Sequence, residues 1–201
     1  MPKFSIIIPA HNSEKYISKA LMSVLDQTYR DYELIVVCDS CTDDTDEVAA
    51  AYGAKVCYIN SGSDGAARSE GLYEATGDWV LFMDDDDWWL HEFALDLIAK
   101  KIESEEEMDI LCFSAIHKGS RYCAASKDNI AVWNKAWKRS FIGQTRFPPI
   151  KSTSDLFFHR EMMAKNPKVV EWDMPIYYYN YMRPGSQTWM EEQERRKNVR
   201  R

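Results

Sequence analysis

Four consecutive carboxylates, Asp84-Asp85-Asp86-Asp87, are the part of this chain whose residue types point most directly to chemistry. Adjacent carboxylates repel one another, and a hard divalent cation such as Mg²⁺ or Mn²⁺, which prefers oxygen ligands, offsets that repulsion. A solvated acidic turn is the alternative, because carboxylates also favour the start of a helix. The run lies between the apolar segment 79–83 and Trp88-Trp89, which favours a metal site over mere surface.

Two further polar clusters follow segments predicted to be strands. Pro9-Ala10-His11-Asn12 ends the first strand, and Asp39 follows the second. Ligands of open α/β sheets bind beyond the carboxyl ends of the strands, so these clusters and the acidic run are expected at one edge. A carboxylate at position 39 can accept a hydrogen bond from a nucleobase N–H, or it can serve a loop or a helix start.

Strand and helix patterns that alternate through the first half of the chain position these residues. Short apolar runs, typical of parallel strands buried on both faces, occur at residues 4–9, 33–38, 55–60 and 79–83. Helices are predicted at residues 17–25, capped by Asn12 or Ser13, and at 43–52 and 66–75, ended by Gly53 and Gly77. This order predicts an α/β fold with a right-handed, doubly wound parallel sheet.

The second half is less regular. Helices are predicted at residues 91–105, 133–141 and 154–163, strands at 110–116 and 176–182, and a loop or weak hairpin at 118–129. We expect a single domain over residues 1–201. Residues 1–90 would form a nucleotide-binding half, 91–187 an acceptor-binding half, and 188–201 a polar C-terminal helix or tail.

Composition excludes several classes of protein. A formal net charge of -7 argues against nucleic-acid binding, which needs a basic surface. No apolar stretch is long enough to span a membrane, and the N-terminus does not resemble a signal peptide, so we expect a cytoplasmic protein. The basic end, residues 195–201, leaves open a weak peripheral contact with the inner face of a membrane. Five cysteines, including a C-x-x-C at Cys38 and Cys41, fit a reducing compartment, and we expect ordinary packing roles for that pair.

Several motifs in order resemble the opening of family 2 glycosyltransferases. They are Ser5-Ile-Ile-Ile-Pro-Ala-His-Asn12, Ser23-Val-Leu-Asp-Gln-Thr-Tyr29, Tyr32-Glu-Leu-Ile-Val-Val37, Arg68-Ser-Glu-Gly71 and Phe82-Met-Asp-Asp-Asp-Asp-Trp88. Looser likenesses follow at Trp133-Asn134-Lys135, at Ser154-Asp155, where the family usually has Glu-Asp, and at Arg183-Pro-Gly-Ser186. The resemblance implies the GT-A fold, a Rossmann-like α/β/α sandwich with a mostly parallel central sheet.

The resemblance also implies a role for each matching residue. Pro9, Ala10, His11 and Asn12 would line the base pocket with Asp39, which would bind the base N–H. Arg68, Asp84, Asp85 and Arg183 would contact the rest of the nucleotide sugar. Asp86 would hold Mn²⁺ or Mg²⁺ against the diphosphate, and Asp155 would be the general base. The family reaction is an inverting sugar transfer from a nucleotide sugar, here a UDP-sugar, to a hydroxyl of a glycan, lipid-linked or protein-linked acceptor.

Alternatives to these assignments come from the residues themselves. His11 stands where many members have a tyrosine that stacks on uracil, a role an imidazole can also fill, and Asp155 can instead open its helix with Ser154. His159, four residues on, has a structural role as its leading interpretation. A degenerate module that binds nucleotide or glycan without turnover is the main competing function. Sugar nucleotidyltransfer fits less well, because the 9–14 loop lacks glycines and a well-placed basic residue.

Overall fold

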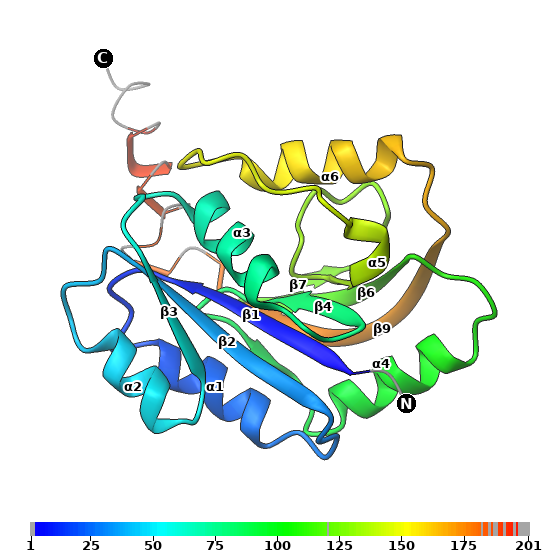
Figure 1. Ribbon diagram of the computed structural model, residues 1–201, viewed down its shortest axis with the longest axis horizontal. Helices are drawn as coiled ribbons and strands as arrows, with labels where there is room; N and C mark the ends of the chain where they lie inside the picture. The colour runs from blue at the N-terminus through cyan, green and yellow to red at the C-terminus, as the bar shows by residue number, and fades with distance from the viewer. Residues whose placement is uncertain are drawn as a thin grey trace.

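A computed structural model describes residues 3–119, 121–181, 183–184, 186, 189–190, 192–194 and 196. One mixed β-sheet forms the centre of the molecule and helices cover both of its faces (Figure 1). This three-layer α/β/α arrangement confirms the predicted fold class, but by its strand pairings the sheet is mixed rather than mostly parallel, because four of the pairings between described residues are antiparallel.

The first half of the chain builds one side of the sheet. Strands β1 (Phe4–Ala10), β2 (Tyr32–Asp39), β3 (Lys55–Ile59) and β4 (Trp79–Phe82) lie in the order β3-β2-β1-β4. All their pairings are parallel, and β1 and β4 are almost entirely buried. Burial on both faces explains why these strands read as continuous apolar runs rather than alternating ones.

The second half extends the same sheet with mixed pairings. Strand β8 (Lys135–Lys138) pairs antiparallel with β4 and with β6 (Ile110–His117), and β9 (Val169–Tyr179) follows parallel to β6. The short β5 (Trp88–Trp89) closes the far edge against β9, and β7 (Arg121–Cys123) forms a hairpin with β6. The hairpin expected within residues 118–129 is therefore confirmed.

Helices divide between the two faces of the sheet (Figure 1). One face carries α1 (Ile17–Leu25), α2 (Thr45–Ala51) and α4 (Ala94–Glu103), and the other carries α3 (Asp64–Glu74), α5 (Arg139–Ile142) and α6 (Ser154–Ala164). Each face has its own apolar cluster. Alternate residues of β1 enter different clusters, Ile6 and Ile8 the first and Ile7 the second, as the two-residue period of a strand requires.

Two expectations about local structure are wrong. Residues 133–141 were expected to be helical, but 135–138 form a strand and only 139–142 a short helix. A short apolar run reads alike in a buried strand and a buried helix, and pairing between β4 and β6 decides for the strand. Neither Asn12 nor Ser13 caps α1, which begins at Ile17 without a side-chain cap.

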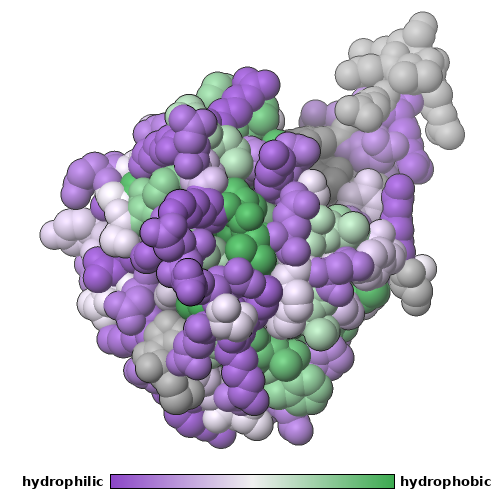
Figure 2. Space-filling view, turned by 90° about the vertical axis from the view of Figure 1, so that its right-hand side faces the viewer, coloured by the Kyte–Doolittle hydropathy of each residue, from purple (hydrophilic) through white to green (hydrophobic). Residues whose placement is uncertain are grey.

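The surface seen in Figure 2 is mostly hydrophilic, with apolar side chains in small groups between the polar ones. In the part of the chain that the structure describes, no helix has the length and apolar character needed to cross a membrane. The five cysteines are free, which agrees with the packing role expected for Cys38 and Cys41. Of the basic segment 195–201, only Arg196 lies within the described residues.

Candidate active site

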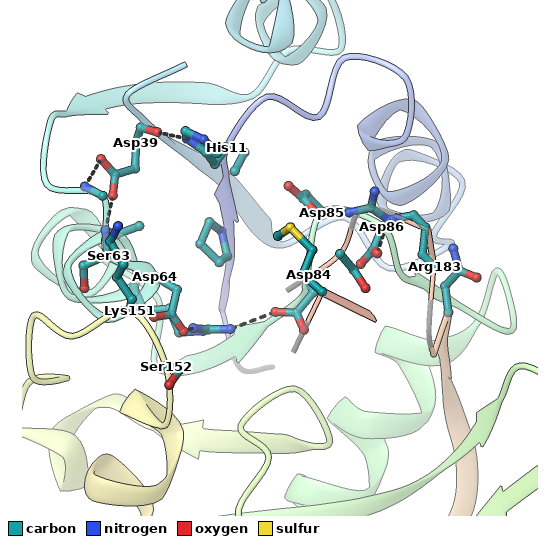
Figure 3. Close-up of a pocket in the computed structure, with 18 of the residues that line it drawn as sticks. His11, Asp39, Ser63, Asp64, Asp84, Asp85, Asp86, Lys151, Ser152 and Arg183 are labelled. Carbon is teal, nitrogen blue, oxygen red and sulfur yellow. Dashed lines mark hydrogen bonds and ion pairs between the residues drawn. The ribbon is translucent and has the colours of Figure 1, made fainter. Parts of the chain in front are cut away.

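A cavity of ≈ 680 Å³ opens at the carboxyl ends of β1, β2 and β4. His11 and Asp39 lie on one side of it, and Asp84, Asp86 and Arg183 on the other (Figure 3). The lining residues come from both halves of the chain: Pro9, Ala10, His11, Asp39, Gly62, Ser63, Asp64, Ala67, Arg68, Asp84, Asp85, Asp86, Lys151, Ser152, Tyr179, Asn180, Arg183, Ser186 and Met190.

Asp39 organises one wall of the cavity. Its buried carboxylate accepts hydrogen bonds from the backbone N–H groups of Ser61, Gly62 and Ser63 at 2.7, 3.0 and 2.7 Å, and from the hydroxyls of Ser40 and Ser61 at 2.9 and 2.7 Å. Burial alone would raise the pKa of Asp39, but these bonds outweigh it and hold the pKa well below its usual range. The carboxylate therefore ties the loop after β3 to the end of β2.

His11 is oriented by the same residue. Its Nδ1 lies 2.6 Å from the backbone oxygen of Asp39, and because a carbonyl oxygen only accepts, Nδ1 carries the proton. In that tautomer Nε2 is the acceptor nitrogen, and the Asn12 amide lies 3.4 Å from it. The ring thus has a defined tautomer and position at the edge of the cavity.

Arg68 is a buried guanidinium that joins three carboxylates from three elements. Its Nη1 lies 2.5 Å from Asp64 at the start of α3 and 3.5 Å from Asp155 on α6, and its Nη2 lies 2.8 Å from Asp84 after β4. Ser154 donates to the same Asp64 carboxylate at 3.0 Å. Arg68 thereby holds both halves of the chain at the centre of the site.

Each carboxylate of the acidic run has a different environment. Asp84 and Asp86 pair with arginines, Arg68 and Arg183, whereas Asp85 lines the cavity without an ion pair among the described residues. Burial, followed by the charge of Asp86, raises the pKa of Asp85 to about 6. Burial also holds the pKa of Asp84 above its ordinary value, although Arg68 opposes that shift.

Asp87 points away from the cavity and into the protein. Its carboxylate accepts the Tyr177 hydroxyl at 2.7 Å and the Asn180 N–H at 2.7 Å, and it is fully buried. Tyr177 in turn accepts the Asp84 N–H at 3.0 Å. Tyr177 on β9 therefore fixes both ends of the acidic run.

The donor set fits a divalent cation that arrives with phosphate ligands. In the described part of the chain, no three His, Cys, Asp or Glu side chains form a self-sufficient metal cluster. Mg²⁺, however, is commonly held by one or two carboxylates together with substrate phosphates. Asp84 and Asp86 both line the cavity and meet that requirement.

Most of the residues predicted from the sequence meet in this cavity. They are Pro9, Ala10, His11, Asp39, Arg68, Asp84, Asp85, Asp86 and Arg183. Asn12 is not in the lining, and its side-chain oxygen instead accepts the Thr42 N–H at 2.7 Å. Asp155 is not in the lining either, but it lies behind Arg68.

Asp155 meets Arg68 through its Oδ1, which lies 3.5 Å from Nη1. Its Oδ2 accepts the Val132 N–H at a long 3.4 Å, and its buried Oδ1 accepts no hydrogen bond from any described residue. Nε2 of His159, on the same helix, lies within hydrogen-bonding distance of the Lys127 backbone oxygen, at 2.7 Å. Burial lowers the pKa of His159. The structural role expected for His159 agrees with that position.

Sequence reasoning missed several lining residues. Asp64 carried a usable signal, because it stands four residues before Arg68 on one helix. Lys151 and Ser152 had none, since they precede the α6 motif in a segment without a pattern. Tyr179 and Asn180 were read only as part of an aromatic strand.

The acidic run is followed by a pair of tryptophans with different roles. Trp89 is 4 % exposed and belongs to the core. Trp88 stacks on Tyr178 at 4.1 Å, with the Lys19 ammonium over its ring at 3.0 Å. Both lie beside α1 in a second, smaller hollow, outside the main cavity.

A cavity with two guanidinium groups and several carboxylates, at the strand ends of an α/β/α sandwich, is typical of proteins that bind nucleotides there. The sequence profile described as Glycosyl transferase family 2 matches residues 5–166. The chain therefore belongs to glycosyl transferase family 2, as its motifs predicted.

Curated relatives agree with this assignment. The chain is 26 % identical over 225 residues to the glycosyltransferase GlyA of Streptococcus pneumoniae, an alignment that covers 94 % of this chain and 32 % of GlyA. It is 37 % identical over 119 residues to the poly(ribitol-phosphate) beta-N-acetylglucosaminyltransferase TarS of Staphylococcus aureus, covering 55 % of this chain and 20 % of TarS. The chain thus spans a third or less of the length of these relatives.

Solved structures match over most of the chain. Staphylococcus aureus TarS 1-349 in complex with UDP-GlcNAc superposes with a TM-score of 0.80 at 27 % identity, covering 93 % of this chain and 60 % of that one. The mannosyltransferase PcManGT of Pyrobaculum calidifontis, solved with GDP-Man and Mn²⁺, superposes with a TM-score of 0.74 at 16 % identity over 94 % of this chain and 59 % of that one. The second likeness concerns the fold alone, and together they confirm the GT-A architecture.

Proposed function

We propose that this protein is a metal-dependent, inverting glycosyltransferase that moves a sugar from a UDP-sugar to a hydroxyl group of an acceptor. The observation that carries the proposal is the meeting of Asp39, Arg68, Asp84, Asp86 and Arg183 in one cavity, with the Asp155 carboxylate directly behind Arg68. A UDP-GlcNAc complex of the structural relative TarS supports a UDP-linked donor.

The donor would lie along the cavity. The base would pack beside Pro9 and His11, and the diphosphate would reach the guanidinium groups of Arg68 and Arg183, whose planar donors suit phosphate oxygens. The role of Asp39 as an acceptor for the base N–H stays a prediction. It requires that its carboxylate exchange one of its loop donors for the base.

Asp86, with Asp84 beside it, would hold the Mn²⁺ or Mg²⁺ ion. When bound, the metal neutralises charge that develops on the leaving diphosphate as the sugar–phosphate bond breaks. Arg68 and Arg183 would add fixed positive charge at the same place, without any reorganisation during the reaction.

Asp155 would take the proton of the acceptor hydroxyl as its oxygen attacks the anomeric carbon. Its Oδ1 is buried beside Arg68, so this role requires that the side chain reach the cavity when the substrates bind. Arg68 pairs with the carboxylate and would hold it in place. A single displacement of this kind inverts the configuration at the anomeric carbon.

The acceptor would enter the cavity beside the donor. We propose a hydroxyl of a glycan, lipid-linked or protein-linked molecule as the acceptor, and residues 91–187 supply Lys151, Ser152 and Arg183 to the cavity lining. The division into two functional halves, the cytoplasmic setting and a weak contact with the inner face of the membrane stay predictions.

A thermal-shift panel tests the donor site. UDP, GDP and their sugars are each added with Mn²⁺, Mg²⁺ or EDTA, and a ligand that binds only the native state raises the melting temperature. We expect a metal-dependent shift with UDP and one UDP-sugar, and its loss in Asp86→Asn. No shift with any nucleotide at millimolar concentration would contradict the donor site.

The second candidate is a degenerate module that binds nucleotide without turnover. The position of Asp155 outside the cavity lining is the observation that favours it. Wild-type protein that binds the donor, yet shows neither sugar transfer nor donor hydrolysis with any acceptor, would support this candidate.

A further inference from the structure

Arg183 forms an ion pair with the carboxylate that is proposed to hold the metal. Its Nε pairs with Asp86 Oδ2 (Figure 3), and the two side chains are only 16 % and 11 % exposed. The guanidinium also lies over the Tyr16 ring, 4.0 Å from its centre. Two contacts from different elements therefore hold Arg183 against Asp86.

This ion pair neutralises Asp86 before any ligand binds, as Arg68 neutralises Asp84. A free divalent cation that bound Asp86 would have to displace the guanidinium. It would then add positive charge beside an arginine that had lost its carboxylate partner. In a partly buried site that separation is costly, because water screens little of the charge.

A metal–nucleoside diphosphate complex changes this balance. The complex is anionic overall, and its phosphate oxygens are strong acceptors for a guanidinium. Arg183 can then exchange Asp86 for a phosphate oxygen without losing an ionic partner. A free metal ion brings no phosphate oxygen, so it offers Arg183 no replacement for Asp86.

We propose that Arg183 is an internal counter-cation that makes the site selective for the metal–nucleoside diphosphate complex over the free metal ion. The metal enters with the nucleotide rather than before it. This inference rests on the proposed function, since it requires that Asp86 bind the metal, and it adds an order of binding that the family relationship does not supply.

The test is an EPR titration of Mn²⁺, which reports the free ion directly, on the full chain with and without UDP. Arg183→Gln removes the counter-cation and exposes Asp86, so we expect nucleotide-free protein to bind Mn²⁺ about tenfold more tightly, or ~1.4 kcal/mol. The same variant should bind the Mn²⁺–UDP complex at least about tenfold more weakly than wild type. Arg160→Gln, on the exposed face of α6, changes the net charge equally and should alter neither affinity.

Tyr16→Leu keeps Arg183 but removes the ring beneath it. We expect an intermediate gain in affinity for free Mn²⁺, which tests the inference even where Arg183→Gln does not fold. If wild type binds Mn²⁺–UDP but neither folded variant binds free Mn²⁺ more tightly than wild type does, this inference is wrong. The proposed function would still stand. Wild type that binds no Mn²⁺–UDP would overturn the proposed function as well.

Discussion

Arg68 shows how one buried side chain assembles a site at the residue scale. Its three carboxylate partners, Asp64, Asp84 and Asp155, belong to segments up to 91 residues apart in sequence, from position 64 to position 155. A lone guanidinium this deeply buried would be costly, but three acidic neighbours compensate its charge. The guanidinium that we propose to bind the diphosphate thus also contacts Asp155, the proposed general base.

Asp155→Asn separates binding from chemistry. The amide keeps the shape of the side chain but cannot take a proton, and general-base catalysis is typically worth about 10²–10⁴-fold. We expect transfer to fall by at least about 10²-fold while the Mn²⁺–UDP thermal shift is kept. Radiolabelled sugar transfer measures the first and the thermal shift the second. Asp128→Asn, on an exposed loop, is the control and should leave both unchanged.

Asp39→Asn tests the anchoring of the loop after β3. The pKa of Asp39 is depressed in the folded protein, so its stabilising effect is present above the unfolded pKa of about 4 and is lost as the pH falls below it. We expect the variant to lose roughly 2–3 kcal/mol of unfolding free energy at pH 7, because several N–H groups lose a charged acceptor. Urea denaturation at pH 7 and at pH 3 should show this difference shrink. A difference independent of pH would contradict the ionic role.

Strand β9 determines the conformation of the acidic run at the scale of elements. The Tyr177 hydroxyl on this strand donates to Asp87 and accepts from the backbone of Asp84, so one side chain braces both ends of the run. Burial raises the pKa values of Asp87 and Tyr177 well above their ordinary values. The fourth aspartate therefore supports the loop, while Asp84, Asp85 and Asp86 face the cavity.

Tyr177→Phe removes that brace and nothing else. It leaves the Asp84 N–H and one Asp87 oxygen without their partner, which should cost about 1–3 kcal/mol of unfolding free energy in a urea titration. Affinity for Mn²⁺–UDP should also fall, because the carboxylates are no longer aligned. Tyr178→Phe, the next residue on the same strand and on its opposite face, should change stability by about 0.5 kcal/mol or less. Equal effects from both variants would refute the brace.

Close packing of helix α3 on the segment before α6 joins the two halves at the scale of the whole molecule. Gly65 has no side chain at this contact, and a Cβ there would clash with the Pro148 carbonyl oxygen and lie 2.9 Å from Ser154 Cβ. Ser63 adds a hydrogen bond to the Ile150 backbone oxygen at 2.9 Å. The cavity wall formed by Gly62, Ser63 and Lys151 depends on this approach.

Gly65→Ala tests the contact, because the contact determines whether the substitution raises or lowers the free energy of unfolding. In an exposed helix the change would stabilise by about 0.5–1 kcal/mol, because alanine is the better helix former. Here we expect destabilisation of roughly 1–3 kcal/mol and weaker UDP binding, since backbone must move to make room. Urea denaturation and the thermal-shift panel measure the two effects. A stabilised variant would show that the halves do not pack as described.

Local patterns in the sequence determined much of this protein by themselves. The strands that carry Pro9, Asp39 and Asp84 are short, buried and apolar, and their ends in a parallel sheet must meet at one edge. That is why Pro9, Asp39 and the acidic run could be placed at one edge from the strand pattern, whereas Arg68 and Arg183 were named only through the family resemblance. Helix and strand patterns near residues 133–141 are alike over so short a run, and there the prediction was wrong.

Only the tertiary structure decided which charges are paired. Arg183 with Asp86 and Tyr177 with Asp87 are contacts between positions 97 and 90 residues apart, and no local pattern encodes them. The same holds for the saturation of Asp39 by its loop and for the place of Asp155 behind Arg68. Residue types and strand ends predict which chemical groups meet at the sheet edge. The partner of each carboxylate depends on the tertiary structure, because these contacts form only when distant segments pack together.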